Sequence, residues 1–299
     1  MLRWPDAGTR VAVRYRRPSG STPPLTDAVG HLLQVDPTVL IRTKTGAVVE
    51  FAPADAIALR VLTDAPVRTS QIRALEHAAA MACPGIEQRW LDGWFLRAGR
   101  GTALVVNSAV PLDVSAELDA VPAIVDWYTG RGLLPRLAVP DRLLRPPGTA
   151  EHPHRVLVRD VASTDPDPSV SLSPHPDEAW LRIHRREIAV EVLTAVVDGE
   201  LIFGTYPGIA VGRAAVTGAP DGTRWVGLSA LRISDDQHAV AAAQRLCEAL
   251  LAWGAEHGAS RGYVRVFDDD ATAEHLVESL GFTVHHRGRY LAVPPVRRL

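Results

Sequence analysis

Apolar and polar residues alternate along the first part of the chain, up to about residue 62. Val11, Val13 and Tyr15 lie at every second position, as in a strand with one buried face. Further short apolar segments, bounded by turn residues, follow at 29–35, 38–43 and 47–51. Four or five short strands in so few residues predict a small β-barrel over residues 1–65. No aromatic cluster marks a binding groove in this segment, so we expect it to have a structural or docking role.

The segment from 66 to 150 mixes helix and strand patterns. A first helix is predicted at 70–80, with Ser70 as its N-cap. A second is predicted at 118–129, where the apolar residues of one face are Leu118, Ile124, Val125 and Tyr128. Strands are predicted around these helices, at 90–96, 103–110 and 134–139. The proline-rich residues 141–154 are predicted to form a linker.

From residue 151 onwards, strand and helix patterns alternate. Strands are predicted at 155–161, 201–205, 209–216, 225–233 and 263–267, with the last ones inside 283–293. Helices are predicted at 177–190, 239–257 and 271–279. The helix at 239–257 has the clearest pattern, because its apolar residues recur at helical spacing: Ala242, Leu246, Leu250 and Trp253. Residues 191–197 fit either type, and the turn signal Asp198-Gly199 favours a strand at 194–197.

Composition limits the functional classes. The chain has 299 residues, 46% of them hydrophobic, which is enough for a sizeable core and two or three domains. A net charge of −2 argues against a general binder of nucleic acids or anionic membranes. Two cysteines exclude a disulfide framework, and no Cys or His pairs have zinc-ligand spacing. The chain has no signal-peptide core and no apolar run near the roughly 20 residues that span a bilayer. We therefore expect a cytoplasmic protein without a metal, a membrane segment or a nucleic-acid partner.

Residues 225–282 follow the order strand, acidic loop, long helix, strand and short helix, and end in Leu280-Gly281-Phe282. This order resembles the acetyl-CoA-binding half of the GNAT superfamily of N-acetyltransferases. A closer resemblance is to a bacterial group that combines an SH3-like front domain, a partial GNAT repeat and a complete GNAT domain. The segments 93–97 and 107–112 resemble the front half of that group. Its members are described as histone-type acetyltransferases or short N-acetylglutamate synthases.

The resemblance implies an α+β fold: a small SH3-like β-barrel at 1–65, a partial GNAT-like repeat at 66–150 and a complete GNAT domain at 151–299. The last two would form a tandem GNAT-like α/β region. The implied activity is transfer of the acetyl group of acetyl-CoA, by direct attack, to a primary amine of a small molecule such as an amino acid, or of a protein. The alternative is a non-catalytic or weakly active GNAT-like protein for binding or assembly. An amine acceptor is the expected partner, and a homodimer is one candidate assembly.

The resemblance also assigns the contacts with acetyl-CoA. The strand backbone from Leu231 to Ile233 would bind the pantetheine arm, and the N–H groups of the following helix would face the pyrophosphate. The phosphate loop aligns with His238, Ala239, Val240, Ala241 and Ala243. Asp270 and Ala273 are further expected contacts.

Several of these positions depart from the pattern of the superfamily. Ala241 replaces a glycine and His238 replaces a constant positive charge. Asp270 stands where asparagine is common, and Val277 stands where a tyrosine often acts as general acid. Asp235 and Asp236 precede the loop, where they would repel a phosphate or, alternatively, cap the helix.

Three residues are the candidates for the chemistry. Ser229 lies on the central strand, where its hydroxyl could order a water; the alternative is a small residue in a tight sheet. His286 could take the proton of the amine, and Tyr290 could donate one to the thiolate; the alternative for both is a solvated, basic strand end. Glu187 and Glu191 could act as a base through water, with a place on a helix surface as the alternative.

Overall fold

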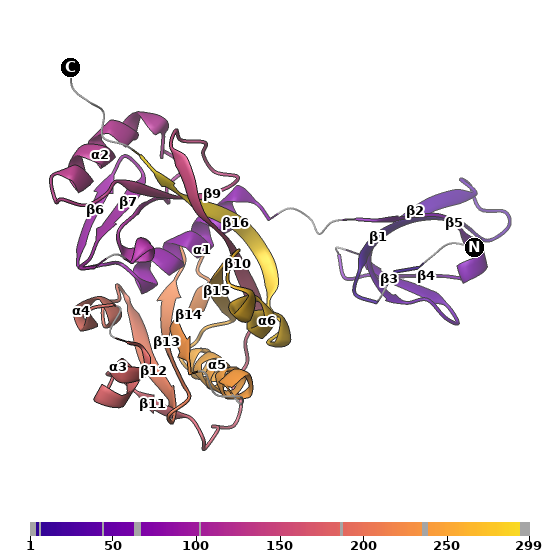
Figure 1. Cartoon of the computed structure of the whole chain (residues 1–299). Coiled ribbons are helices and arrows are strands. Elements are labelled where there is room, and N and C mark those ends of the chain that lie inside the picture. The colour runs from indigo at the N-terminus through magenta and orange to yellow at the C-terminus, as the bar shows by residue number, and fades with distance from the viewer. Residues whose placement is uncertain are drawn as a thin grey trace. The chain divides into compact units, whose positions relative to one another are not determined.

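The computed structural model describes residues 4–5, 7–43, 45–62, 67–101, 103–185, 188–234 and 239–293. The chain divides into two compact units, Met1–Pro66 and Val67–Leu299, whose elements are labelled in Figure 1. All the residues that the sequence marks as candidates for the chemistry belong to the second unit.

The first unit is a five-stranded antiparallel sheet. Its strands are β1 (Arg10–Arg16), β2 (Leu25–Gln34), β3 (Val39–Thr43), β4 (Val48–Phe51) and β5 (Ala56–Val61), in the order β4-β3-β2-β1-β5. A short 3-10 helix, η1 (Pro53–Asp55), precedes β5. Inward-facing residues such as Val11, Val13 and Ile41 form one apolar core. The predicted short strands are confirmed. Within the described residues the sheet is open, with β4 and β5 at its edges, and a closed SH3-like barrel stays a prediction.

The second unit is built on one sheet of eleven strands, in the order β11-β12-β13-β14-β15-β10-β16-β9-β8-β7-β6. The strands are β6 (Glu87–Leu91), β7 (Trp94–Ala98), β8 (Ala109–Pro111), β9 (Arg136–Pro140), β10 (Thr149–Asp160), β11 (Ser171–Ser173), β12 (Gly199–Tyr206), β13 (Ala210–Gly218), β14 (Arg224–Ile233), β15 (Arg261–Phe267) and β16 (Thr283–Ala292). Only the β14–β15 and β8–β9 pairings of this sheet are parallel in the described part of the chain. In Figure 1 the long β10–β16 pair arches through the unit and joins its β6–β9 part to its β11–β15 part.

The helices of this unit are α1 (Thr69–Ala82), α2 (Val121–Thr129), α3 (Glu178–Ile183), α4 (Val190–Leu193), α5 (Ala239–Glu256) and α6 (Ala271–Ser279). The 3-10 helices η2 (Leu104–Val106) and η3 (Leu118–Ala120) precede β8 and α2. The predicted N-cap Ser70 lies inside α1, where instead the Gln71 side chain accepts a hydrogen bond from the Arg68 N–H. Of the predicted inward residues of the second helix, Ile124, Val125 and Tyr128 are buried on α2, whereas Leu118 lies on η3 and is exposed.

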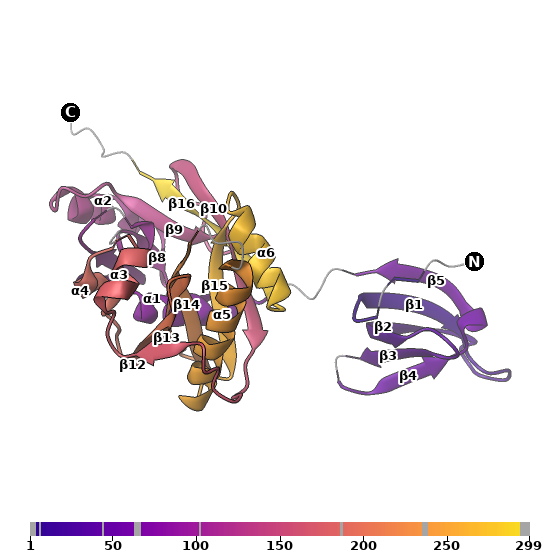
Figure 2. The same ribbon diagram turned by 60° about the horizontal axis from the view of Figure 1, so that its bottom comes forward.

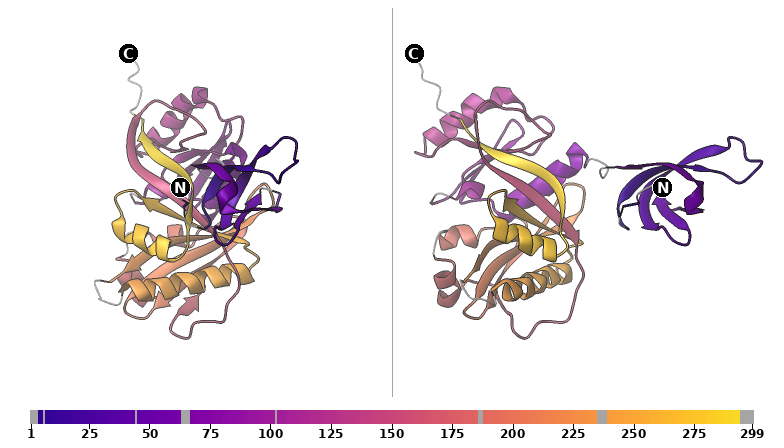
Figure 3. Two further views of the ribbon diagram at one scale, coloured as in Figure 1. Left: turned by 90° about the vertical axis from the view of Figure 1, so that its right-hand side faces the viewer. Right: turned by 45° about the vertical axis from the view of Figure 1, so that its right-hand side comes forward.

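The two faces of β14 are covered by different helices. Val226 packs with Leu250 of α5, whereas its neighbour Trp225 packs with Leu75 of α1. Because successive side chains of a strand point to opposite faces, α5 and α1 lie on opposite sides of the sheet. Gly254 permits the close approach of α5, since an added Cβ there would lie 2.4 Å from Val226. Figures 2 and 3 show α6 beside α5 on the same face.

Two strand predictions in the front half are wrong. The strand predicted at 90–96 is a hairpin whose turn is formed by Asp92 and Gly93, with φ angles of 45° and 81°. Asp-Gly is a strong hairpin signal, but the apolar residues on both sides of it also fit a single strand. Residues 103–110 do not form one strand, because η2 takes up the middle of this segment.

The linker predicted at 141–154 is also wrong in its second half. Residues 149–154 belong to β10 and pair with β16. The register of this pairing shifts between Glu151 and His154, and His152 has a φ of 46°. This bulge accommodates Pro153, which has no N–H for a regular ladder.

Residues 177–197 contain two short helices instead of the predicted elements. The helix predicted at 177–190 ends at Ile183, and Arg185 with a φ of 59° turns the chain away. The strand predicted at 194–197 is absent from the described chain, where α4 ends just before this segment. The β12–β13 hairpin begins only at Gly199, so the turn signal at Asp198-Gly199 does not extend the strand backwards.

Candidate active site

The site begins where the two parallel strands β14 and β15 separate. They pair from Trp225–Arg261 to Leu228–Val264. Beyond Leu228, β14 continues against β13, and β15 continues against β10 as far as Phe267. The two strands therefore diverge in the middle of the sheet and open a gap between their C-terminal ends.

A bulge distorts β14 at this point. Arg213 of β13 is opposite Ser229, but Val211 is opposite Arg232, so β14 has one extra residue. Ala230 within the bulge has a φ of 51°. A non-glycine residue in this region is strained by roughly 1–2 kcal/mol, and such strain is often kept at functional sites.

The strain at Ala230 leads to a first prediction. Ala230→Gly should raise the melting temperature by about 1–3 °C, because glycine adopts a positive φ without a Cβ clash. Ala230→Val should lower the melting temperature, since a β-branched residue resists this conformation. Thermal melts of the two variants would check both expectations. Equal melting temperatures for the two variants would contradict a strained bulge.

The gap between the strands is a cavity of about 270 Å³, which we call the cleft. Its lining comes mainly from β14, β15, α5 and α6, with Val105 of η2, and it includes Leu228–Arg232, Val264–Phe267, Cys247, Asp270, Ala273, Leu276, Val277 and Leu280. Burial raises the pKa of Cys247 to about 12, so this thiol stays protonated. The cleft is a mostly apolar slot that narrows towards Leu228.

Several predicted cofactor contacts lie at the cleft. Leu231, Asp270 and Ala273 line it, and so does Val277. The Asp270 carboxylate caps α6, because it accepts a hydrogen bond of 2.9 Å from the Ala273 N–H. Ile233 packs against the α5 core.

The phosphate-loop residues lie at the start of α5. Ala239 and Ala243 are buried, whereas Val240 and Ala241 are exposed on the first turn. His238 lies outside the described residues, as do Asp235 and Asp236.

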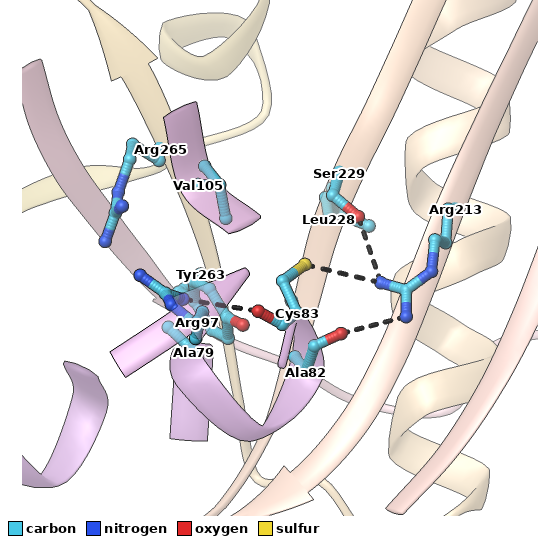
Figure 4. A pocket seen from close by; sticks show the side chains of 11 residues that line it. Ala79, Ala82, Cys83, Arg97, Val105, Arg213, Leu228, Ser229, Tyr263 and Arg265 are labelled. Atoms are coloured by element: carbon cyan, nitrogen blue, oxygen red, sulfur yellow. Dashed lines mark hydrogen bonds between the residues drawn. The ribbon is translucent and has the colours of Figure 1, made fainter. Parts of the chain in front are cut away.

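Two further cavities lie on the α1 side of the sheet. The inner cavity, of about 60 Å³, is lined by Ala79, Ala82, Cys83, Arg97, Val105, Arg213, Gly227, Leu228, Ser229, Tyr263 and Arg265 (Figure 4). The outer cavity, of about 360 Å³, is lined by apolar side chains of η2 and α4, by Ile188 and Phe267, and by Ala230 and Arg232 of β14; it shares Cys83, Val105, Arg213 and Ser229 with the inner one. Ser229 and Val105 line all three cavities.

Arg213 of β13 connects the segments around these cavities through hydrogen bonds. Its side chain is only 2% exposed, and its guanidinium makes five hydrogen bonds. The acceptors are the carbonyl oxygens of Ala82, Leu193 and Ala195, the Ser229 hydroxyl at 3.2 Å and the Cys83 sulfur at 3.7 Å. One residue thus joins the ends of α1 and α4 to the bulged strand, and its positive charge faces carbonyl dipoles at helix C-termini.

Arg97 of β7 faces the inner cavity from the other side (Figure 4). It is 3% exposed and donates to the Ser108 carbonyl and hydroxyl and to the Cys83 carbonyl, at 3.3–3.4 Å. Burial lowers the pKa of Arg97, and the nearby Arg265 charge lowers it further. Within the described residues, Arg97 has no carboxylate in ion-pair contact.

A buried polar network lies behind Arg265. Arg265 donates to both Glu76 carboxylate oxygens at 2.9 Å and to the Tyr290 hydroxyl at 3.0 Å. His286 Nε2 lies 2.9 Å from Glu76, and its Nδ1 lies 2.8 Å from His285 Nδ1. Burial alone raises the pKa of Glu76, but Arg265 and His286 more than offset it and hold this pKa well below its usual range.

A neutral histidine borders this network. His154 is buried and packs against Tyr290 and Phe267. Burial and the Arg265 charge lower its pKa to about 3. Burial and the neighbouring His286 likewise lower the pKa of His285 to about 4. His154 and His285 are therefore uncharged at neutral pH, next to the ion pair of Arg265 and Glu76.

The predicted catalytic residues lie in two different places. Ser229 faces all three cavities. His286 and Tyr290 are buried behind Arg265, and neither belongs to the lining of the cavities described above. Glu191 is exposed, and Glu187 lies outside the described residues. The catalytic roles of these residues stay predictions.

Sequence reasoning missed the charged residues that surround the cavities: Glu76, Arg97, Arg213 and Arg265. A signal for two of them was available. Arg97 and Arg213 each interrupt a run of apolar or small residues, in 94–98 and 210–216. A single charge inside a strand that is otherwise buried on both faces indicates a specific partner. Glu76 gave no such signal, because polar residues are common on helices.

Comparison with protein families decides the identity. Residues 69–291 match the family described as "Probable histone acetyltransferase Rv0428c C-terminal", and residues 5–60 match "Rv0428c N-terminal Sm-like domain". The chain belongs to this family. A relative from Mycobacterium tuberculosis (strain ATCC 25618 / H37Rv), "Probable histone acetyltransferase Rv0428c", is 60% identical over 299 residues, which cover 99% of this chain and 98% of the relative.

Solved structures show that the Rv0428c-type fold is GNAT-like. A GCN5-related N-acetyltransferase from Kribbella flavida has a TM-score of 0.51 at 14% identity, over 77% of this chain and 97% of its own. A putative GNAT-family acetyltransferase from Novosphingobium aromaticivorans has a TM-score of 0.50 at 17% identity, over 73% and 97%. The protein is an acetyltransferase of the GNAT type with a small N-terminal Sm-like β domain. The tandem arrangement and the boundary at residue 150 stay predictions.

Among the described residues of this family member, no helix is both long and apolar enough to cross a membrane. The same residues contain no group of three or more His, Cys, Asp or Glu side chains that could hold a metal ion.

Proposed function

We propose that the protein transfers the acetyl group of acetyl-CoA to an amine, with the cosubstrate in the cleft between β14 and β15. The observation that carries this proposal is the separation of two parallel strands at the strained bulge of Ala230, directly above a cavity of about 270 Å³. Most of the residues that line this cavity are apolar, which suits the pantetheine arm. It also reaches Ser229, which the acceptor-side cavities share.

The residues present fit acetyl-CoA at both ends of the cleft. At Leu231, β14 has left its pairing with β15, so its backbone can bind an amide-rich arm. The first turn of the 18-residue α5 has exposed positions at Val240 and Ala241, and free N–H groups at such a terminus suit a pyrophosphate.

Acetyl-CoA supplies a thioester whose carbon the neutral amine attacks; the C–S bond breaks, CoA leaves as the thiol and the amine loses a proton. Ser229 is positioned by the hydrogen bond from Arg213, so its hydroxyl can hold a water that accepts this proton. Arg265 lines the cleft and the inner cavity, where its positive charge can stabilise the negative charge that develops. In this proposal His286 and Tyr290 act by holding Glu76 and Arg265 in place.

Calorimetric titration with acetyl-CoA tests the proposal. We expect saturable binding to the wild type. Ala273→Trp, which fills the cleft at the first turn of α6, should weaken it at least about tenfold, because the pantetheine arm would lose its space. His275→Trp is the matched control, since His275 lies on the exposed face of the same helix.

Three outcomes separate the possibilities. Equal binding by both tryptophan variants would place acetyl-CoA elsewhere and contradict the proposed site. Absence of binding to the wild type would contradict the proposed function itself. Binding without turnover of any amine would favour the alternative, a GNAT-like binding protein, which the apolar Val277 at the cleft also favours.

A further inference from the structure

We propose that the inner cavity binds a carboxylate of the acceptor, and that the acceptor is a small amine with a carboxylate next to the amine and an apolar body. The inference rests on the proposed acetyl transfer and specifies the class of its acceptor. It follows from the charges of the inner cavity, from the donors left on Arg97 and from the way the cavities adjoin.

Positive charge dominates the inner cavity. Its lining includes the guanidinium groups of Arg97, Arg213 and Arg265, which Figure 4 shows on both sides of Cys83. Among the described residues, the carboxylate in ion-pair contact with this group is Glu76, which binds Arg265. Buried charges are destabilising unless they are paired. Three guanidinium groups with one carboxylate around the inner cavity therefore favour an anionic ligand in it.

The three arginines differ in the donors that they can offer. Arg213 directs all five of its N–H groups to protein acceptors. Arg265 is engaged by Glu76 and Tyr290. Arg97 makes only three contacts, all of 3.3–3.4 Å, and a guanidinium has five N–H groups. Arg97 is therefore the residue that can bind a carboxylate through two parallel hydrogen bonds.

The size and position of the cavities define the rest of the ligand. A space of about 60 Å³ accepts a carboxylate and little more. It shares Ser229 with the cleft, so an amine one carbon away from the carboxylate would lie at the bulge. The adjoining outer cavity of about 360 Å³, with Leu104, Val192 and Phe267 in its lining, would take the apolar body.

This arrangement disfavours a lysine-rich peptide as the acceptor. The ε-amine of a lysine in such a peptide carries no adjacent carboxylate, and the neighbouring ammonium groups would be repelled by the arginines of the inner cavity. An α-amino acid with an apolar side chain fits this arrangement. Its carboxylate would lie in the inner cavity, its amine at the bulge and its side chain in the outer cavity.

Calorimetric titration in the presence of CoA tests the inference with three probes of similar shape: L-leucine, L-leucinamide and 3-methylbutylamine. For the wild type we expect L-leucine to bind at least about tenfold more tightly than the other two, because they leave Arg97 without an anion. Arg97→Lys keeps the charge but loses the two parallel N–H donors of the guanidinium, so it should reduce this preference. Arg97→Met should abolish it. Arg131→Met removes a partly exposed arginine in the turn after α2 and should leave the preference unchanged.

The outcomes distinguish this inference from the proposed function. Equal binding of the three probes, or no binding of L-leucine at millimolar concentration, would overturn the carboxylate site. So would acetylation of a lysine-rich peptide more efficiently than of any amino acid. Turnover of amines without preference for a carboxylate would overturn the inference but leave acetyl transfer standing. If Arg97→Met does not fold, the relative affinities for the three probes in the wild type and in Arg97→Lys still test the carboxylate site.

Discussion

Replacing Arg213 by methionine should lower the melting temperature of the chain by about 6–12 °C and abolish acetyl transfer. The change removes five hydrogen bonds from a side chain that is 2% exposed. Each acceptor left buried without a donor costs about 1–3 kcal/mol, so we expect a loss of at least about 3 kcal/mol, at roughly 2–4 °C per kcal/mol for a domain of this size. Thermal melting and a thiol-release assay measure the two effects.

A surface arginine provides the comparison. Arg245 forms an ion pair with Asp167, and its side chain is half-exposed. Arg245→Met should change the melting temperature by no more than about 2 °C, because such exposed pairs contribute little. If both variants melt alike, Arg213 is not the element that joins α1, α4 and β14. If Arg213→Met melts lower but keeps full activity, its hydrogen bond to Ser229 has no part in the reaction.

Glu76→Gln should be the second large change, with a loss of about 3 kcal/mol or more. The variant leaves the buried Arg265 without a counter-charge, and breaking one side of a buried ion pair costs about 3–5 kcal/mol. Glu248→Gln is the matched control, because Glu248 pairs with Arg159 at the surface and is half-exposed. Denaturation by urea at pH 7 would compare the two. A similar loss in both variants would contradict a special role for the buried pair.

The effect of Glu76 should depend on pH in a defined direction. The folded-state pKa of this carboxyl lies below its ordinary value of 4.5, so the unfolded chain takes up the proton first as pH falls. The stability from Glu76 is complete above pH 4.5 and decreases as the pH falls from there towards the lower folded-state pKa. The difference in melting temperature between the wild type and Glu76→Gln should therefore be largest near pH 7 and shrink below pH 4.5. A difference that grows on acidification would contradict this assignment.

The fold of the acetyl-transfer half could be predicted because its signals are local. The apolar residues of α5 recur at helical spacing, and β14 and β15 are short apolar segments on either side of it. Their order alone indicated the superfamily. The turn signal at Asp92-Gly93 is equally local, but the apolar residues on both sides of it also fit one continuous strand. The bulge at His152 was not predictable, because it depends on where β16 pairs.

The charged surroundings of the site could not be predicted, because they are assembled from distant parts of the chain. Arg265 and Glu76 are 189 positions apart, and Arg213 and Ala82 are 131 positions apart. Ser229 could be predicted as a candidate from its place on the central strand, and its catalytic role stays a prediction. His286 and Tyr290 were named from their place in the family pattern, and only the tertiary structure shows Arg265 between them and the cleft.

The meeting of three cavities at Ser229 has a consequence for the kinetics of this enzyme. Among the three cavities, residues of α5 and α6 line only the cleft, and residues of α1 line only the inner cavity. If the cleft holds acetyl-CoA and the other two cavities hold the acceptor, as proposed, both can be bound at the same time. Transfer should then proceed within a ternary complex, and double-reciprocal plots of initial rates should intersect rather than run parallel.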